Sequence, residues 1–122
     1  MINITDQVTQ ALNESGTKEG VALVFVNGST AAITSIEYEP GLEKDMDELL
    51  EKFAPEEADY EHHKTWGDHN GAAHLKSAFI GTDFSVPVEE GRLILGTWQQ
   101  IVLLDFDERP REREIIVKFL AQ

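Results

Sequence analysis

A continuous apolar run, VALVFV at residues 21–26, is the feature that most constrains the fold of this chain. Six consecutive apolar residues without polar alternation are typical of a β-strand that is covered on both faces. Asn27-Gly28 follows at once, and this dipeptide indicates a tight hairpin turn. The next residues, STAAITSIE at 29–37, are rich in small and β-branched side chains and predict the returning strand of the hairpin.

Two segments have the periodicity of amphipathic helices. We expect Thr5 or Asp6 to cap the first helix and Gly16 to end it. A second helix is expected at residues 42–53, with acidic residues and lysines on its outer side. Asp45 lies at the edge of its apolar stripe, where a carboxylate either needs a partner or is an exposed flank residue. The apolar faces consist of Ile4, Val8, Ala11 and Leu12 in the first helix, and of Leu42, Met46, Leu49, Leu50 and Phe53 in the second.

Three further extended segments complete the pattern. Residues 82–88 predict an edge strand, because Pro87 cannot donate a ladder hydrogen bond. Residues 92–106 predict a long strand with a polar insert, and residues 115–120 predict the last strand. Runs of strands with two or three helices, without regular βα alternation, favour an α+β fold with a largely antiparallel sheet. We expect one domain over residues 1–122.

Composition excludes several classes of function. The 122 residues include no cysteine, which excludes disulfides, thiolate zinc sites and a cysteine nucleophile. The formal net charge is −13, and residues 43–61 contribute nine acidic residues against two lysines. Such a surface repels phosphates, so we expect no nucleic-acid partner. No apolar run approaches the roughly 20 residues of a membrane span, and no signal peptide is recognisable, so we expect a cytoplasmic protein without a membrane partner.

The segment EHHKTWGDHNGAAHLKSAFIG, residues 61–81, contains all four histidines of the chain. A loop that leads into a short helix would place several of its polar side chains in one pocket. The alternative is a solvated connection, but the density of titratable groups favours a site. The histidines are His62, His63, His69 and His74, and the other polar residues of interest are Asp68, Asn70, Lys76 and Ser77.

The same segment offers candidate metal ligands. His62, His74 and Asp68 would form a mixed imidazole–carboxylate site for zinc or a similar divalent cation. Their spacing matches no HExxH or zinc-finger pattern, and histidines on a polar loop are more often unliganded. We expect His63 and His69 to face solvent.

An anion site is the second candidate. Gly71-Ala72-Ala73 opens a helix, and the free N–H groups of a helix start can bind a phosphate, although most helix starts bind only water. Lys76 would add positive charge, and Arg92, Arg111 and Arg113 are further phosphate-capable groups in a chain that is poor in cations.

Thr97-Trp98-Gln99 interrupts an apolar strand and is the third candidate. A buried Gln99 must be hydrogen-bonded. Trp98 is either a stacking wall for a flat ligand or a residue that fills the core. The sequence contains no G-x-G-x-x-G, Walker loop, G-x-S-x-G or catalytic-triad spacing, so nucleotide-dependent and hydrolase chemistry lack support.

Three segments form a recognisable pattern in this order: STAAITSIEYEPG (29–41), WGDHNGAAHLKSAFIG (66–81) and SVPVEEGRLILGTWQQI (85–101). The run from Ser85 through Gly91 to Gly96-Thr97-Trp98-Gln99 is the most specific signature. Together the segments resemble the YjbQ family, which is also known as the uncharacterised protein family UPF0047, and the resemblance extends over nearly the whole chain.

The resemblance implies a compact α+β domain with two mostly antiparallel sheets, assembled as a homotrimer. It also implies a weak thiamine-phosphate synthase activity, in which a pyrimidine methyl diphosphate and a thiazole phosphate form thiamine phosphate and pyrophosphate. The alternative is a non-catalytic homotrimer that binds a metal or a metabolite. Carried over by motif, the catalytic positions are His62, His74, Asp68 and Glu37, and the substrate-binding positions are Asn70, Lys76, Trp98, Gln99, Thr97, Arg113 and Asp45.

Two departures from the family pattern matter. Many members have a histidine near position 28, where this chain has Asn27-Gly28. If that histidine acts in catalysis in the relatives, we expect this chain to lack the activity. Members also usually begin with a strand ahead of the first helix, whereas Met1 lies almost at the helix in this chain, so we expect one edge strand to be missing.

Overall fold

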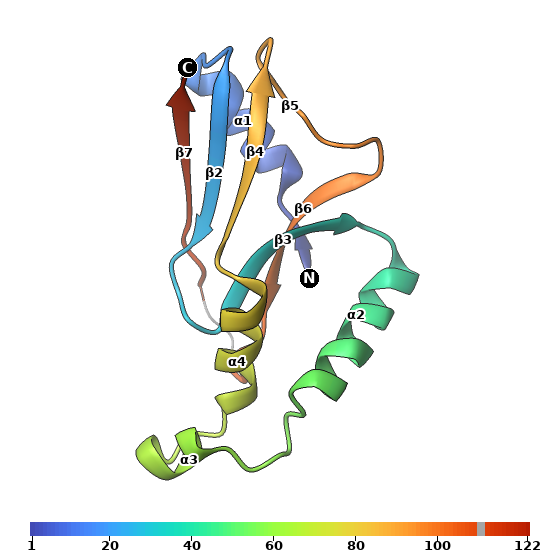
Figure 1. Cartoon of the computed structure of the whole chain (residues 1–122), viewed down its shortest axis with the longest axis vertical. Coiled ribbons are helices and arrows are strands. Elements are labelled where there is room, and N and C mark those ends of the chain that lie inside the picture. The colour runs from blue at the N-terminus through green and yellow to red at the C-terminus, as the bar shows by residue number, and fades with distance from the viewer. Residues whose placement is uncertain (110–111) are drawn as a thin grey trace.

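The chain folds into two antiparallel sheets with helices around them, as the computed structural model of residues 1–109 and 112–122 shows (Figure 1). Every strand pairing in these residues is antiparallel, which confirms the predicted fold class. The three-stranded sheet has the order β1 (Ile2–Asn3), β6 (Gln99–Asp105), β3 (Ala31–Glu37). The four-stranded sheet has the order β5 (Arg92–Leu93), β4 (Asp83–Glu89), β2 (Gly20–Val26), β7 (Ile115–Ala121).

The described residues form four helices, one more than the largest number predicted. The additional helix arises because the histidine segment folds as two helices rather than as a loop and one helix. None of these helices is long and apolar enough to span a membrane. The helices are α1 (Thr5–Ser15), α2 (Pro40–Phe53), α3 (Glu61–Trp66) and α4 (Gly71–Ile80).

The predicted hairpin at Asn27-Gly28 is wrong. β2 pairs with β4 and β7, while β3 pairs with β6 in the other sheet. Neither Asn27 nor Gly28 has the positive φ that a type I′ turn requires at both central residues. The Asn27 N–H instead donates to the Glu114 carbonyl at 3.0 Å, and a Cβ on Gly28 would lie 2.9 Å from Arg113 Nη1. The dipeptide therefore carries the chain from one sheet to the other.

The predicted long strand at residues 92–106 is also two strands, one in each sheet. The polar insert between β5 and β6 causes the break, because Gln99 braces a turn: its Oε1 accepts from Gly96 N at 3.0 Å and its Nε2 donates to Ser35 Oγ at 2.9 Å. The predicted edge position of β4 is wrong, since β5 pairs with it. Only Val88 and Glu89 of β4 take part in that pairing, so the missing backbone N–H group of Pro87 costs no ladder hydrogen bond to β5.

A short strand precedes the first helix, contrary to the expectation that it is missing. β1 pairs with β6, with Ile2 opposite Leu103. The first helix ends at Gly16, which has the predicted left-handed conformation with φ of 70°. Neither Thr5 nor Asp6 caps its start, because Ile4 is the cap residue and makes no side-chain hydrogen bond there.

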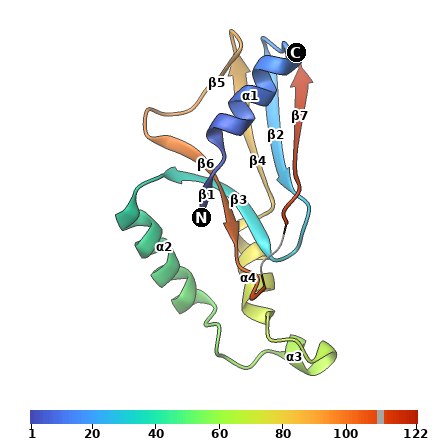
Figure 2. The same ribbon diagram turned by 180° about the vertical axis from the view of Figure 1, so that it is seen from behind.

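Both sheets and α1 contribute to one hydrophobic core. Val8 and Leu12 of α1 are each 1% exposed, and α1 lies across one face of the four-stranded sheet, in front of it in the view of Figure 2. The prediction that residues 21–26 are covered on both faces is wrong: Ala22, Val24 and Val26 are buried, whereas the alternate residues are partly buried or, at Val21, exposed, because only one face of β2 is fully covered. Core residues from the two sheets are Ala22, Val24, Val26, Val86 and Val88 on one side, and Ala31, Ile33, Ile101 and Leu103 on the other.

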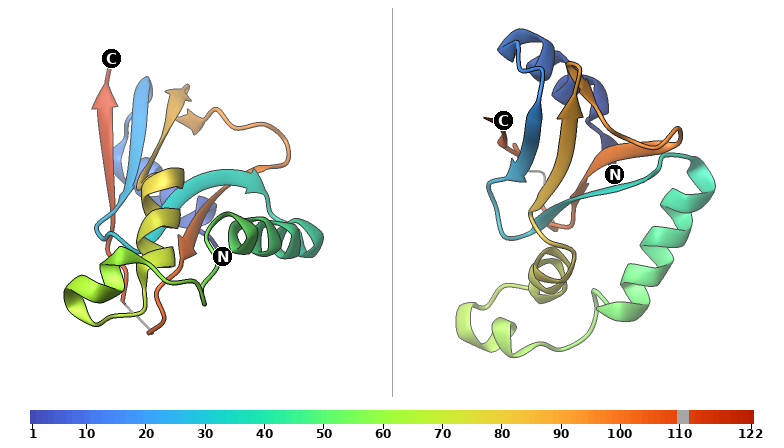
Figure 3. Two further views of the ribbon diagram at one scale, coloured as in Figure 1. Left: turned by 60° about the horizontal axis from the view of Figure 1, so that its bottom comes forward. Right: turned by 45° about the horizontal axis from the view of Figure 1, so that its top comes forward.

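The second helix stands beside the sheets rather than across either face, as two views show (Figures 1 and 3). It begins earlier than predicted, because Glu39 caps it by accepting from the backbone N–H groups of Gly41 and Leu42. Within α2, which is described throughout, Leu50 alone is buried, and Leu49 is 61% exposed. The predicted apolar stripe is therefore largely uncovered, and Asp45 is an exposed flank residue.

Arg113 ties together three segments that are distant in sequence. Its Nη2 donates to Asp105 Oδ1 at 2.7 Å and to Thr30 Oγ1 at 2.8 Å, and its Nε donates to Asp105 Oδ2 at 3.0 Å. The start of β3, the end of β6 and the approach to β7 are thereby held together. The hydrogen bond from Arg113 is the main reason why the pKa of Asp105 lies below its usual value.

We predict that Leu12→Ala lowers the free energy of unfolding by about 2–5 kcal/mol, because it leaves a cavity between α1 and the sheets. The matched control is Leu120→Ala, at a side chain that is 62% exposed; it should change stability by no more than about 0.5 kcal/mol. Urea unfolding followed by circular dichroism measures both. Equal losses in the two variants would contradict this assignment of the core.

We also predict a specific acid dependence of stability. A lowered folded-state pKa means that the Asp105–Arg113 pair stabilises the fold above the unfolded-state pKa of about 3.9 and loses this contribution as the pH falls through the lower folded-state value. Urea unfolding between about pH 2 and pH 5 should therefore show a shallower decline in Asp105→Asn than in the wild type. Asp83→Asn, at an exposed carboxylate of β4, should keep the wild-type slope. The pair lacks this role if Asp105→Asn keeps it too.

Candidate functional site

The histidine segment forms a compact pair of short helices at one end of the molecule. α3 ends at Gly67, whose φ of 71° is left-handed and whose N–H donates to the His63 carbonyl. The chain then returns into α4. This turn brings His62 of α3 and His74 of α4 together, with ring centroids 4.7 Å apart. His69, in the turn itself, lies 5.2 Å from His63 between ring centroids.

Two of these imidazoles have defined hydrogen bonds. His62 Nε2 lies 3.0 Å from Asn70 Oδ1. His63 Nε2 accepts from the backbone N–H of Gly71 at 3.2 Å, and this N–H belongs to the helix start that we predicted to bind an anion. His63 is therefore half-buried and bonded rather than solvent-facing, whereas His69 is exposed as expected. The first turn of α4 is buried, which leaves less of it open to a ligand than the sequence suggested.

Tyr60, just before α3, contacts both the preceding connection and α4. Its hydroxyl donates to the Pro55 carbonyl at 2.6 Å, and burial, followed by the charge of Glu51, raises its pKa. Its ring also packs so closely on α4 that a Cβ at position 71 would lie 2.8 Å from the Cβ of Tyr60. Glycine at position 71 is thus required for close approach.

The predicted metal triad is not assembled. In the part of the chain that the structure describes, no group of three or more His, Cys, Asp or Glu side chains is arranged to hold a metal ion. His62 and His74 are neighbours, but Asp68 does not complete a site with them. The donor set therefore does not fit a preformed metal centre.

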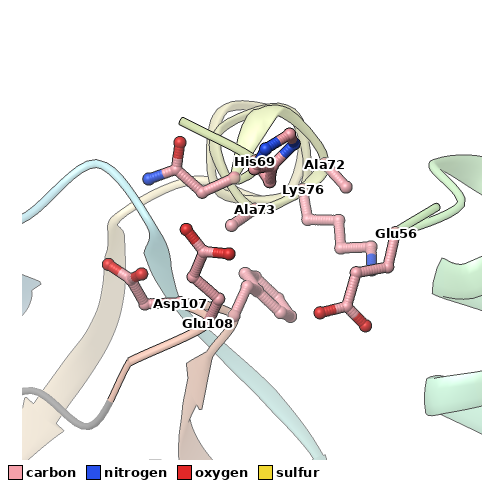
Figure 4. Close-up of a pocket in the computed structure, with 9 residues that line it drawn as sticks. Glu56, His69, Ala72, Ala73, Lys76, Asp107 and Glu108 are labelled. Carbon is pink, nitrogen blue, oxygen red and sulfur yellow. The ribbon is translucent and has the colours of Figure 1, made fainter. Parts of the chain in front are cut away.

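Three cavities that share lining residues lie around the histidine segment; together we call them the histidine cleft and each one a lobe, and Figure 4 shows the first lobe. Adjacent lobes share residues: Asn70 and Asp107 line two of them, and Glu56, His69 and Glu108 line another two. The first lobe, about 260 Å³, is lined by Glu56, His69, Asn70, Ala72, Ala73, Lys76, Phe106, Asp107 and Glu108. The second, about 230 Å³, is lined by Glu56, Glu57, Ala58, Asp59, His63, His69 and Glu108. The third, about 260 Å³, is lined by Ser29, Thr30, Asn70, His74, Asp107 and Arg113.

Lys76 is the cation of the first lobe. Its side chain is 13% exposed, its Nζ lies 3.9 Å from Glu51 Oε2, and it sits 5.9 Å from the ring centroid of Phe106. Figure 4 shows Lys76 and His69 on the α4 side, facing carboxylates from other segments.

Sequence reasoning missed the acidic walls of the cleft. The acidic residues at 56–59, Asp107 and Glu108 lie in connections between helices and strands, and no site was predicted there from the sequence. Their approach to α4 depends on long-range folding, which no local pattern encodes. Among the residues that the structure describes, five carboxylates line the three lobes against two cations, Lys76 and Arg113.

The remaining predicted site residues lie elsewhere. Glu37 pairs with Gln99 at one end of the β3–β6 ladder, and Ala31 pairs with Asp105 at the other end, beside α4. Six residue steps along a strand separate these ends by roughly 20 Å. One chain therefore does not bring Glu37, Thr97, Trp98 and Gln99 into the histidine cleft, as the single predicted pocket required.

Trp98 lines a separate cavity, which we call the Trp98 pocket. Trp98 is 72% exposed, so it does not fill the core. Arg92 forms an exposed ion pair with Glu90 at 3.6 Å, and Arg111 lies outside the described residues. The Trp98 pocket has a volume of about 410 Å³ and is lined by Asn3, Glu37, Tyr38, Glu39, Thr97, Trp98 and Gln100.

Comparisons with known proteins agree on one family. The family model described as "UPF0047 protein YjbQ-like" matches residues 1–122. A UPF0047 protein of Archaeoglobus fulgidus is 42% identical over 120 residues, which cover 98% of this chain and 90% of that protein. The UPF0047 protein YugU of Bacillus subtilis is 40% identical over 122 residues, covering 99% and 89%.

Solved structures lead to the same result. The crystal structure of a YbjQ-like protein of unknown function from Sulfolobus solfataricus P2 superposes with a TM-score of 0.93. It is 40% identical in sequence, and the match covers 99% of this chain and 86% of that chain. Sequence and fold thus agree over the full length, and the chain belongs to the YjbQ-like UPF0047 family.

Proposed function

We propose that the histidine cleft binds small phosphorylated metabolites and that the protein, as a cytoplasmic homotrimer, is a transferase of the thiamine-phosphate synthase type. One observation carries this proposal: the third lobe gathers hydrogen-bond donors from three segments. Hydroxyl, amide and guanidinium groups are the donors that recognise phosphate oxygens. The side chains of the lobe that can donate are those of Ser29, Thr30, Asn70, His74 and Arg113. The Thr30 hydroxyl already donates to the Asp107 carboxylate, which lines the same lobe.

In this reaction the thiazole nitrogen attacks the methylene carbon of the pyrimidine, and the bond from that carbon to the diphosphate oxygen breaks. Negative charge develops on the departing diphosphate, which the donor lobe would stabilise. His74 would protonate the leaving group as a general acid. Pyrophosphate leaves, and the new C–N bond makes the thiazole nitrogen cationic.

The acidic walls of the cleft are consistent with this chemistry. Carboxylates repel a phosphate, so they limit the affinity for anionic substrates. They attract the positive charge that develops on the pyrimidine methylene and the thiazolium ring. Glu56 and Glu108 lie opposite α4 and would supply this field (Figure 4). A weak activity is the expected result of the two opposing effects.

A second candidate is a non-catalytic homotrimer that binds a metabolite or a divalent metal. The close approach of His62 and His74 favours it, since two imidazole nitrogens can act as ligands. The missing third ligand weakens the metal version. Elemental analysis together with calorimetry against zinc tests the metal version, which is refuted if the protein carries no metal and shows no saturable zinc binding.

The homotrimer is supported by an exposed apolar patch between α2 and α4. Phe53 and Phe79 stack with ring centroids 4.4 Å apart, yet they remain 46% and 71% exposed. Leu49 and Leu75 extend the patch at 61% and 48% exposure. Contiguous apolar surface of this kind is typical of an interface, and a closed oligomer would cover it.

We predict that the purified protein converts the pyrimidine diphosphate and the thiazole phosphate into thiamine phosphate, measured as its fluorescent oxidation product. His74→Ala should lower the rate by about 10²-fold through loss of the general acid. Lys118→Ala, on β7 and away from the cleft, should keep the wild-type rate. No product from the wild-type protein would refute the transferase proposal.

Sedimentation at micromolar concentration should give a mass near three times 13.7 kDa. Phe79→Asp should shift it toward 13.7 kDa, because a carboxylate in the patch is costly to bury. Leu120→Asp, at an exposed leucine outside the patch, should leave the trimer intact. A wild-type monomer would contradict the assembly.

A further inference from the structure

The Trp98 pocket is a candidate site in its own right, because it is formed by different elements from the histidine cleft. It lies where β3 ends and α2 begins, next to β1 and the turn that leads into β6. Its volume of about 410 Å³ exceeds that of each lobe of the histidine cleft and falls within the usual range for small-molecule pockets.

Trp98 is presented on a braced turn. Gln99 N donates to the Gly96 carbonyl at 3.0 Å, Gly96 N donates to Gln99 Oε1 at 3.0 Å, and Gln99 Nε2 is anchored to Ser35 on β3. These hydrogen bonds hold the backbone of Trp98 in place without a ligand. Trp98 is 72% exposed and Tyr38 is 40% exposed, so two aromatic side chains at this pocket are open to solvent.

The charges at the pocket all have one sign. Glu39 is held in place because it accepts from the N–H groups of Gly41 and Leu42 at 2.9 and 2.6 Å. Glu37 is exposed at the end of β3. Among the described residues that line the pocket, none is Lys or Arg.

Amide groups complete the lining. Asn3 Nδ2 donates to Gln100 Oε1 at 3.0 Å, and Gln100 Nε2 donates to the Gln99 carbonyl at 3.2 Å. These amides are engaged with one another and with the backbone, so they do not offset the two carboxylates. An anionic ligand would be repelled here.

Aromatic side chains beside carboxylates recognise organic cations, because the indole face attracts positive charge and the carboxylates add a Coulombic term. We propose that the Trp98 pocket binds a small organic ammonium ion, independently of the histidine cleft. The readout below requires no phosphate substrate and no synthase activity, so its outcome is separate from that of the proposed function.

The chain has two tryptophans, Trp66 and Trp98, and Trp66 is 73% exposed. Trp66→Phe therefore leaves Trp98 as the only indole reporter. Choline is titrated into this variant at constant ionic strength, with sodium chloride as the compensating salt. We expect a saturable change of fluorescence with a Kd on the order of 1 mM. The uncharged carbon analogue of choline, 3,3-dimethylbutan-1-ol, should bind at least about tenfold more weakly, because it lacks the charge.

Variants made in the same background locate the site. Glu37→Gln should weaken choline binding about fivefold, since such a contact is worth on the order of 1 kcal/mol. Glu48→Gln, on the outer side of α2, is the matched control and should change nothing. His74→Ala should also leave the affinity for choline unchanged, because that residue belongs to the other cleft. Calorimetry on Trp98→Leu, which needs no indole reporter, should show no saturable binding.

Three results would overturn the proposal. The first is a linear response to choline, or an equal response to the uncharged analogue. The second is an unchanged affinity in Glu37→Gln or in Trp98→Leu. The third is shielding of Trp98 from acrylamide quenching in the native assembly, since a pocket covered by another copy is not open to a ligand.

Discussion

The antiparallel pairing of β3 with β6 determines the functional layout of the molecule. Seven residue pairs, from Ala31–Asp105 to Glu37–Gln99, fix one strand on the other. The Ala31 end receives α4 through the hydrogen bond from Ser77 Oγ to the Ala31 carbonyl, and it receives Arg113 through Thr30. The Glu37 end carries the Trp98 turn. Because the register is fixed by buried side chains, a slip by one residue would turn the core face of β3 outward and displace both ends.

Local chemistry in the sequence predicted much of this fold. The glycine at position 16 ends α1 because it tolerates a left-handed backbone, and the apolar periodicity placed α1 on the core. The fold class followed from strands without regular helical crossovers. The hairpin failed because a turn signal reports local preference only, whereas β2 already has a hydrogen-bonded neighbour on each side. Strand partners depend on burial against residues that are distant in sequence, and a dipeptide turn signal carries no information about those residues.

For the candidate site too, local features could be predicted from the sequence whereas long-range contacts could not. The density of histidines indicated a cluster, and the structure brings the four rings together. The family pattern grouped Trp98 with them, but it carries no information on distance within one chain. The acidic walls arise from residues at 56–59 and 107–108, which approach α4 only in the folded state. The sequence also did not predict that Leu50 is the one buried residue of α2, because helical periodicity identifies an apolar side of a helix but not the residues that cover it.

The exposed position of α2 has a consequence for the histidine cleft. A 14-residue helix is marginal by itself in water, so most of its order must come from packing. If another copy provides that packing, mass action makes the helical order of α2 a function of protein concentration. Glu51 of α2 lies 3.9 Å from the ammonium group of Lys76, which lines the cleft. Fraying of α2 upon dilution would therefore release Lys76 from that carboxylate, so dilution and ligand affinity become thermodynamically linked variables.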